Sequence, residues 1–289
     1  MVLREAIPQD RDGILKIATH TWEGWDYVPL FIDTWLAEKG LFVAEAGKKI
    51  VGITKTTELS KGELWFEAIR VAEEERGKGL GMEIAKRQLE MALATHPRSI
   101  RLSTADRNKA SISISKSLGF VERVLFQFYE DYGSPGVPLR EDLNIVTLRG
   151  EQMIKKAWCI IQESEEYHLS KKLLPHTWEF YDFTEELFSR LAQEGFVFST
   201  EDTGGVLVLL KNRYSSLNYE VAFLEGSEES VSELSVFAQR RFEQKASDDY
   251  MDAFAVSERK KGILERFGMK RSKDIEKVIV FEYPLPAFR

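Results

Sequence analysis

Residues 64–82 read Leu64-Trp-Phe-Glu-Ala-Ile-Arg-Val-Ala-Glu-Glu-Glu-Arg-Gly-Lys-Gly-Leu-Gly-Met82. An apolar run typical of a strand leads into alternating glycines, and an amphipathic helix predicted over 79–95 follows. The glycines expose backbone N–H groups where the helix presents its positive end, which suits a phosphate or pyrophosphate. The loop is not a Walker A loop, because no Gly-Lys-Ser/Thr follows four spacer residues. It is not a dinucleotide fingerprint either, because Met82 stands where the third glycine would be.

A second pattern follows further along the chain. A predicted strand over 99–104 precedes Asn108-Lys-Ala-Ser111, a predicted helix and Leu118-Gly-Phe120, in which Gly119 fits a helix C-cap with positive φ. The two patterns together, including Arg-x-x-Gly-x-Gly after a strand that ends in Val, resemble the GNAT superfamily of N-acetyltransferases over roughly residues 1–130. The resemblance implies an α/β fold, with helices on a mixed α+β sheet, and acetyl-CoA as cosubstrate without a metal.

Length and composition indicate the number of domains and exclude several classes of partner. A chain of 289 residues usually forms two domains. We predict a catalytic domain over 1–132, a Pro- and Gly-containing linker over 133–150, and a second domain over 151–289. The net charge of −7 argues against a nucleic acid or an anionic membrane as partner, and no apolar run is long enough to cross a membrane. Cys159 is the single cysteine and the four histidines are scattered, so we expect no metal site in a cytoplasmic protein.

The second half looks like a worn copy of the first. A shift of 149 residues places the helix predicted over 79–95 on 228–244, and Leu118-Gly-Phe120 on Phe267-Gly-Met269. This match predicts tandem GNAT domains with a degenerate second copy. The glycine loop corresponds to Glu225-Gly-Ser-Glu-Glu-Ser230, whose carboxylates would repel a pyrophosphate by about 1 kcal/mol each in wet surroundings. We therefore expect the second half not to bind CoA.

Acetyl transfer to an amine needs a base that removes the ammonium proton. Glu63, Trp65 and Glu67 share one face of the predicted strand by alternation. We prefer Glu67 as the catalytic base, because it lies nearer the expected splay of that strand, and Glu63 is the second candidate. The resemblance implies a tyrosine on the helix before Gly119 as general acid, but that position is Ser115. Water, or a tyrosine elsewhere such as Tyr129, could serve instead.

The resemblance also implies where acetyl-CoA would bind. An oxyanion needs a donor, which in this family is a backbone N–H at the bulged end of the fourth strand. The same segment pairs with the pantetheine arm, and the glycine loop donates to the phosphates. The predicted cofactor-binding residues are Ile69, Arg70, Val71, Arg76, Gly77, Lys78, Gly79, Leu80, Gly81, Met82, Asn108 and Ser111.

A segment rich in aromatic residues precedes the second predicted helix and reads His20-Thr-Trp-Glu-Gly-Trp-Asp-Tyr-Val-Pro29. Trp22, Trp25, Asp26 and Tyr27 are candidates for a substrate pocket with a place for a cation; a core-packing loop is the alternative. Together with the strand over 64–71, this segment resembles histidine N-acetyltransferase-like proteins. That resemblance implies a free amino acid or another small amine as acceptor.

Three functions are compatible with these patterns. The first is an N-acetyltransferase that moves acetyl from acetyl-CoA to a primary amine by direct attack, the amine being a small molecule or free amino acid. The second is acetylation of a protein N-terminus or lysine, which would require an open peptide groove. The third is a non-catalytic acetyl-CoA sensor or interaction protein. A homodimer is common for such folds, but no residue here predicts one.

Overall fold

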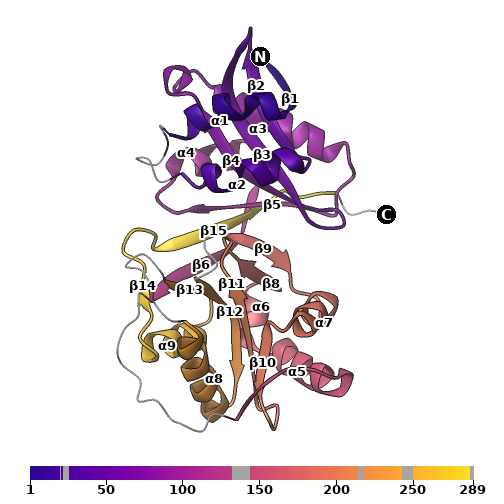
Figure 1. Cartoon of the computed structure of the whole chain (residues 1–289), viewed down its shortest axis with the longest axis vertical. Helices are drawn as coiled ribbons and strands as arrows, with labels where there is room; N and C mark the ends of the chain where they lie inside the picture. The colour runs from indigo at the N-terminus through magenta and orange to yellow at the C-terminus, as the bar shows by residue number, and fades with distance from the viewer. Residues whose placement is uncertain (20, 22–25, 132–143, 214–217, 243–249, 287–289) are drawn as a thin grey trace. The chain divides into compact units, whose positions relative to one another are not determined.

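The computed structural model describes residues 1–19, 21, 26–131, 144–213, 218–242 and 250–286. The chain divides into two compact units. Unit 1 comprises residues 1–104, 108–122 and 281–289, and unit 2 comprises residues 105–107 and 123–280. Both are mixed α/β structures, which confirms the predicted fold class (Figure 1).

Unit 1 is a sheet with the strand order β1-β2-β3-β4-β5. The first four strands are antiparallel, whereas β4 and β5 run parallel. Its elements are β1 (Val2–Glu5), the 3-10 turn η1 (Pro8–Asp10), α1 (Arg11–Ala18), α2 (Val28–Ala37), β2 (Leu41–Ala46), β3 (Lys49–Ser60), β4 (Glu63–Val71), the 3-10 turn η3 (Glu73–Glu75), α3 (Leu80–Leu93), β5 (Ser99–Ala105) and α4 (Lys109–Ser117).

The core of unit 1 explains where its helices lie. Ile14 and Ile17 of α1, and Ile32 and Trp35 of α2, bury their side chains against Val43, Ile53 and neighbouring residues of β2 and β3. Each helix thus presents one apolar face to the sheet, as its sequence period requires. The helices α1 and α2 therefore cover one face of the sheet that contains the parallel pair β4–β5.

Unit 2 has the same strand order and directions. Its strands follow as β7-β10-β11-β12-β13-β6, and only β12 and β13 are parallel. Its elements are β6 (Val121–Asp131), β7 (Ile145–Thr147), α5 (Glu151–Glu163), α6 (Glu165–Leu169), β8 (Leu173–His176), β9 (Glu179–Asp182), α7 (Glu185–Glu194), β10 (Val197–Thr200), β11 (Gly205–Lys211), β12 (Tyr219–Gly226), α8 (Glu228–Arg241), β13 (Met251–Ala255), α9 (Glu258–Arg266), β14 (Lys270–Arg271) and β15 (Lys277–Glu282).

The chain passes from one unit to the other within β6 and again within β15, in strands at the edges of the two sheets. Residues 123–131 of β6 belong to unit 2, where they pair with β13 from Met251↔Asp131 to Ala255↔Gln127. Residues 281–289 belong to unit 1, where the Tyr283 N–H donates to the Ile100 carbonyl at 2.9 Å. The units therefore differ from the predicted division at 132 and 150, because each receives its closing segment from the other half. Most of the predicted linker, 132–143, lies outside the described residues.

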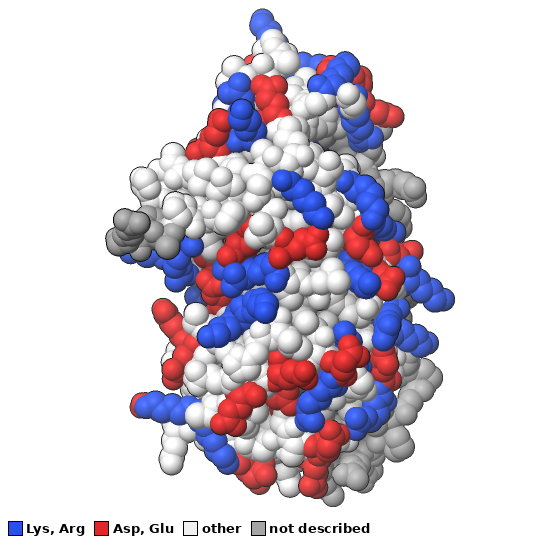
Figure 2. Space-filling model, turned by 180° about the vertical axis from the view of Figure 1, so that it is seen from behind, with Lys and Arg blue, Asp and Glu red and all other residues white. Residues whose placement is uncertain are grey.

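Several helix ends lie where the sequence predicted them. Gly119 and Gly268 both follow a helix and have φ of 89° and 88°, which confirms the predicted cap at Gly119. The helix after the glycine loop runs from Leu80 to Leu93, slightly shorter than predicted. Acidic and basic side chains are interspersed on the face seen in Figure 2. In the described part of the chain, no helix is long and apolar enough to cross a membrane.

Candidate functional site

The glycine loop of unit 1 is open on the side where backbone N–H groups converge. Gly77 and Gly79 have φ of 76° and 81°, a region that glycine enters without steric cost. A Cβ added at either would meet no heavy atom within 4 Å. Gly79 is the N-cap of α3, and no side chain caps this helix. The first-turn N–H groups of α3 are therefore available to an anion.

Side chains around the loop neutralise one another. Lys78 forms an exposed ion pair with Glu75 at 3.0 Å. The Arg76 guanidinium donates from Nε to the Val71 carbonyl at 3.3 Å, which ties the loop to the end of β4. The backbone, more than these side chains, therefore gives the loop its positive character.

A bulge interrupts β4 before it reaches the loop. Lys55 opposes Glu67 and Ile53 opposes Arg70, so Thr54 of β3 faces two residues of β4, Ala68 and Ile69. Ala68 is buried and has φ of 58°. A non-glycine residue in this region costs about 1 kcal/mol or more, so the surrounding structure holds the bulge in place.

The bulge fixes the direction of the next N–H groups. The Ala72 N–H donates to the Val51 carbonyl at 2.9 Å, toward β3. Because successive N–H groups of a strand point to opposite edges, Val71 and Ile69 direct theirs to the other edge of β4. On that edge the ladder with β5 covers only Glu63↔Ser99 to Trp65↔Arg101 among the described residues. Beyond it the two parallel strands separate, as we expected for this strand.

Glu67 is the first acidic residue of β4 beyond this last paired row. Its side chain is half-buried. The Thr57 hydroxyl of β3 donates to Glu67 Oε1 at 2.6 Å, which orients the carboxylate. Thr57 was not predicted as a site residue; the hairpin register of β3 and β4 was the signal that could have found it.

Glu63, the second candidate base, lies in a different environment. Its carboxylate is buried and accepts from Arg101 of β5 at 2.8 Å and from the Ser60 hydroxyl at 2.8 Å. Arg101 also donates to Glu282 at 2.5 Å. A buried carboxylate that is already engaged by a guanidinium and a hydroxyl is not open to a substrate ammonium, and breaking such a buried pair is costly. The geometry therefore favours Glu67 over Glu63.

Of the predicted substrate pocket, Asp26 and Tyr27 can be placed, whereas Trp22 and Trp25 lie outside the described residues. Asp26 forms a bidentate, buried ion pair with Arg70, with distances of 2.7 and 3.1 Å. The Arg70 guanidinium also lies 5.2 Å from the centroid of the Tyr27 ring. Burial raises the pKa of Tyr27 to about 12. Both residues thus anchor the segment to β4, and Arg70 already occupies the cation position that the sequence predicted.

The model of the Acetyltransferase (GNAT) family matches residues 11–120. Most of unit 1 is therefore similar to this family. Beyond the family match, the whole chain is similar in fold to solved structures. A GCN5-related N-acetyltransferase from Sphaerobacter thermophilus has a TM-score of 0.65 at 10% identity, over 99% of this chain and 97% of that one. A candidate acetyltransferase from Thermoplasma acidophilum has a TM-score of 0.62 at 15% identity, over 99% and 100%. Among curated proteins, none matches the sequence significantly.

Helix α4 of unit 1 begins at a side-chain cap and contains a buried serine. Asn108 is the N-cap and accepts from the Ser111 N–H at 3.2 Å. Ser115, at the position where the resemblance implies a tyrosine, is buried and donates to the Ser111 carbonyl at 2.9 Å. Its hydroxyl proton is thereby committed to the helix backbone, so Ser115 does not replace the missing acid.

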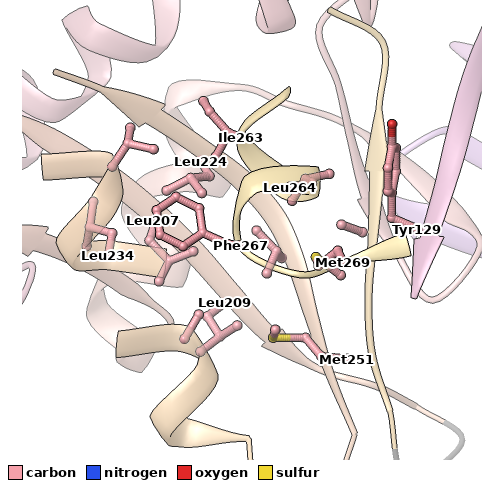
Figure 3. Close-up of a cluster of buried hydrophobic side chains, with 14 of the residues drawn as sticks. Tyr129, Leu207, Leu209, Leu224, Leu234, Met251, Ile263, Leu264, Phe267 and Met269 are labelled. Atoms are coloured by element: carbon pink, nitrogen blue, oxygen red, sulfur yellow. The ribbon is translucent and has the colours of Figure 1, made fainter. Parts of the chain in front are cut away.

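Tyr129 does not belong to unit 1. It lies on β6 in unit 2, among buried side chains from β11, β12, α8 and α9 (Figure 3). Its hydroxyl donates to Glu265 at 3.0 Å, and burial raises its pKa to about 12. The prediction of Tyr129 as general acid assumed that β6 closes the first sheet, and the exchange of closing strands removes that basis.

The counterpart of the glycine loop in unit 2 is closed. Ser227 caps α8 by accepting from the Ser230 N–H at 3.2 Å. A Cβ added at Gly226 would lie 2.4 Å from the Gly205 Cα. Arg259 pairs with Glu225 at 2.9 Å and with Glu228 at 3.2 Å. No open anion site remains at this helix end in the described residues.

A lysine occupies the bulge of β12. The register between β11 and β12 shifts at Ala222, and Lys260 of α9 donates to the Ala222 carbonyl at 3.1 Å. Lys260 also lies 3.9 Å from Glu166, whose carboxylate accepts from the Val256 and Ser257 N–H groups at 3.0 and 2.7 Å. Burial lowers the pKa of Lys260. The side chain of Lys260 therefore fills the place in unit 2 that corresponds to the bulged edge of β4.

Proposed function

We propose that unit 1 is a GNAT domain, which transfers an acetyl group from acetyl-CoA to a primary amine by direct attack. The observation that carries this proposal is the uncapped, glycine-lined start of α3, directly after a bulged strand whose outer N–H groups face away from β3. An anion-binding helix end and an unpaired strand edge together match a ligand with a pyrophosphate and an extended amide arm. We also propose that this enzyme acts in the cytoplasm.

Each part has one role. The N–H groups from Gly77 to Met82 would hold the pyrophosphate, and the outer edge of β4 would pair with the amide arm. The Ile69 N–H would donate to the thioester oxygen as it becomes an oxyanion. Glu67 would accept the proton of the substrate ammonium, after which the amine nitrogen forms the C–N bond and the C–S bond breaks. The sulfur leaves as a thiolate and takes its proton from water, since Ser115 is engaged elsewhere.

The acceptor we propose is a free amino acid or another small amine. The support is the residue pattern around Asp26 and Tyr27. Because Asp26 is paired to Arg70, the substrate ammonium would be held by Glu67 and not by Asp26. A protein N-terminus or lysine is the alternative acceptor class, and binding without turnover is the outcome that a sensor would give.

The test is release of CoA thiol from acetyl-CoA against amino acids, polyamines and N-terminal peptides. We expect turnover with a small amine, and Glu67→Gln should lower kcat/KM by about 100-fold or more, the size of a general-base contribution. Glu90→Gln is the matched control, because Glu90 is an exposed carboxylate of α3. Turnover with peptides alone would replace the proposed acceptor, and CoA binding without turnover on any amine would refute the enzyme.

A further inference from the structure

The last described residues of the chain are part of the GNAT domain. The Tyr283 N–H donates to the carbonyl of Ile100 in β5, and Glu282 pairs with Arg101 at 2.5 Å. A Cβ at Gly119 would lie 3.8 Å from the Tyr283 ring, so this ring covers the end of α4. The segment that follows unit 2 in sequence therefore lines β5 and α4 in unit 1.

Aromatic contacts lead from this segment to β4. The Tyr283 ring meets Phe120 edge-on, with centroids 5.4 Å apart. Phe120 in turn packs on Phe66, with centroids 6.1 Å apart, and both side chains are buried. Phe66 directly precedes Glu67. A shift of the Tyr283 ring is therefore passed on to the residue next to the proposed base through two packed rings.

Ion pairs make a second connection to the same place. Arg101 is 3% exposed and is held between Glu282 and Glu63. Its strand partner is Trp65, in the last paired row before β4 and β5 separate. Glu282 thus fixes the guanidinium that fastens the two strands where their separation begins.

We propose that Glu282 and Tyr283 are positioning residues for acetyl transfer, which hold β4 and β5 so that Glu67 stands at the correct distance from the amine. The inference rests on the proposed function, because it assigns these residues a role in that reaction. It also explains why the chain end belongs to the compact unit that contains the glycine loop. The contacts described above lead to β4 and β5 and not to the glycine loop, so CoA binding should not depend on these two residues.

The test compares Tyr283→Ala with Tyr283→Phe, which keeps the ring. In Tyr283→Ala we expect kcat to fall by about 10-fold to 100-fold, since a misplacement near 1 Å has effects of this size. The dissociation constant of CoA should stay within about twofold, because the loop backbone supplies that binding energy. Tyr283→Phe should retain wild-type kcat. Glu282→Gln should lower kcat more than Glu122→Gln, which breaks an exposed pair with Lys116.

A double-mutant cycle separates positioning from a general loss of folded protein. If Tyr283 acts through Glu67, Tyr283→Ala should have little further effect on kcat in a Glu67→Gln background. Hydrogen exchange of the Glu67–Val71 amides should become faster in Tyr283→Ala and stay unchanged in Tyr283→Phe, and this readout needs no turnover. Multiplying effects on kcat, or unchanged exchange, would overturn the inference while leaving the proposed function intact. Absence of wild-type turnover, by contrast, would overturn the proposed function and the role in transfer with it.

Discussion

The starts of helices α3 and α8 occupy equivalent places in two sheets with the same strand order, yet one is open and the other is closed. Gly79 leaves the N–H groups of α3 uncapped, whereas Ser227 caps α8. Arg259 reaches across from α9 to the carboxylates at the start of α8, and Lys260 fills the adjacent bulge. The comparison teaches that a ligand site in this fold needs backbone N–H groups without partners inside the protein. A few polar side chains that bind these groups or fill the space beside them are enough to close such a site.

The largest effect is expected from placing a carboxylate at the open helix end. Gly79→Glu combines a negative charge with a side chain at the anion position, as in the unit 2 loop. We expect the dissociation constant of CoA, measured by calorimetry, to rise by about 100-fold or more, or about 2.7 kcal/mol. The control is Gly47→Glu, because Gly47 also has positive φ (67°) and open space around an added Cβ. Equal loss in both variants would mean that backbone strain, and not the anion site, sets the affinity.

An effect of similar size, on stability instead of on CoA binding, is expected from removing the lysine that closes unit 2. Lys260→Met leaves the Glu166 carboxylate and the Ala222 carbonyl without their ammonium partner. We expect the free energy of unfolding, from chemical denaturation, to fall by about 3 kcal/mol. Lys261→Met is the matched control, since Lys261 pairs with the exposed Glu258 and should cost at most about 1 kcal/mol.

The Lys260→Met variant also tests whether residues other than Lys260 prevent unit 2 from binding CoA. Because Ser227 and Arg259 remain, Lys260→Met should still bind CoA with the stoichiometry of the wild-type chain. A second equivalent of bound CoA would contradict the view that the loop carboxylates and the cap close this unit.

The two parallel strand pairs also differ in how they neutralise buried charge. In unit 1, Glu63 meets Arg101. In unit 2, Glu220 and Asp252 lie opposite each other on β12 and β13, both fully buried. Burial raises the pKa of Glu220 to about 7, and burial with the neighbouring Glu220 raises the pKa of Asp252 well above its usual range. Unit 2 thus holds protons where unit 1 holds an ion pair.

The smallest effect concerns pH. A carboxyl whose pKa is raised on folding stabilises the protein at low pH, because the unfolded chain gives up its proton first. The free energy of unfolding should therefore fall as the pH rises from about 4.5 to 7, by roughly 1.4 kcal/mol per unit of pKa difference. Glu220→Gln needs no proton and still offers an acceptor to the Thr177 N–H, which donates to Glu220 at 2.5 Å. We expect it to be more stable than the wild type at pH 8, by about 2 kcal/mol.

Glu151→Gln, an exposed carboxylate paired to Lys155, is the control for this measurement and should leave the pH dependence unchanged. Parallel pH curves for the wild type and Glu220→Gln would show that the buried pair is not the proton-holding group.

Much of the local structure could be predicted from the sequence. Gly119 was predicted as a helix C-cap, and it follows α4 with φ of 89°. The glycine loop was located for the same kind of reason, because its residues are neighbours in sequence, whereas the splay of β4 was an assumption about the fold that no residue pattern supplied. The bulge was expected at Ile69 to Val71 and lies at Ala68–Ile69, since alanine carries no signal for positive φ.

Long-range pairings could not be predicted in this way. Asp26 is 44 residues from Arg70, and Arg101 is 181 residues from Glu282. Nothing in the local pattern of β6 distinguishes pairing with β5 from pairing with β13, because both choices satisfy the same alternation. The assignments of Tyr129 to the site and of a domain boundary at 132 both depended on that choice.

The position of Tyr283 has a consequence for how the protein is made. During synthesis the N-terminal part emerges first, and domains generally fold as they appear. Unit 1, however, lacks its closing segment until the residues from Phe281 onward have left the ribosome. Until then the edge of β5 that receives Tyr283 is exposed. An exposed strand edge is a template for wrong strand pairing, so completion of this segment protects the nascent chain.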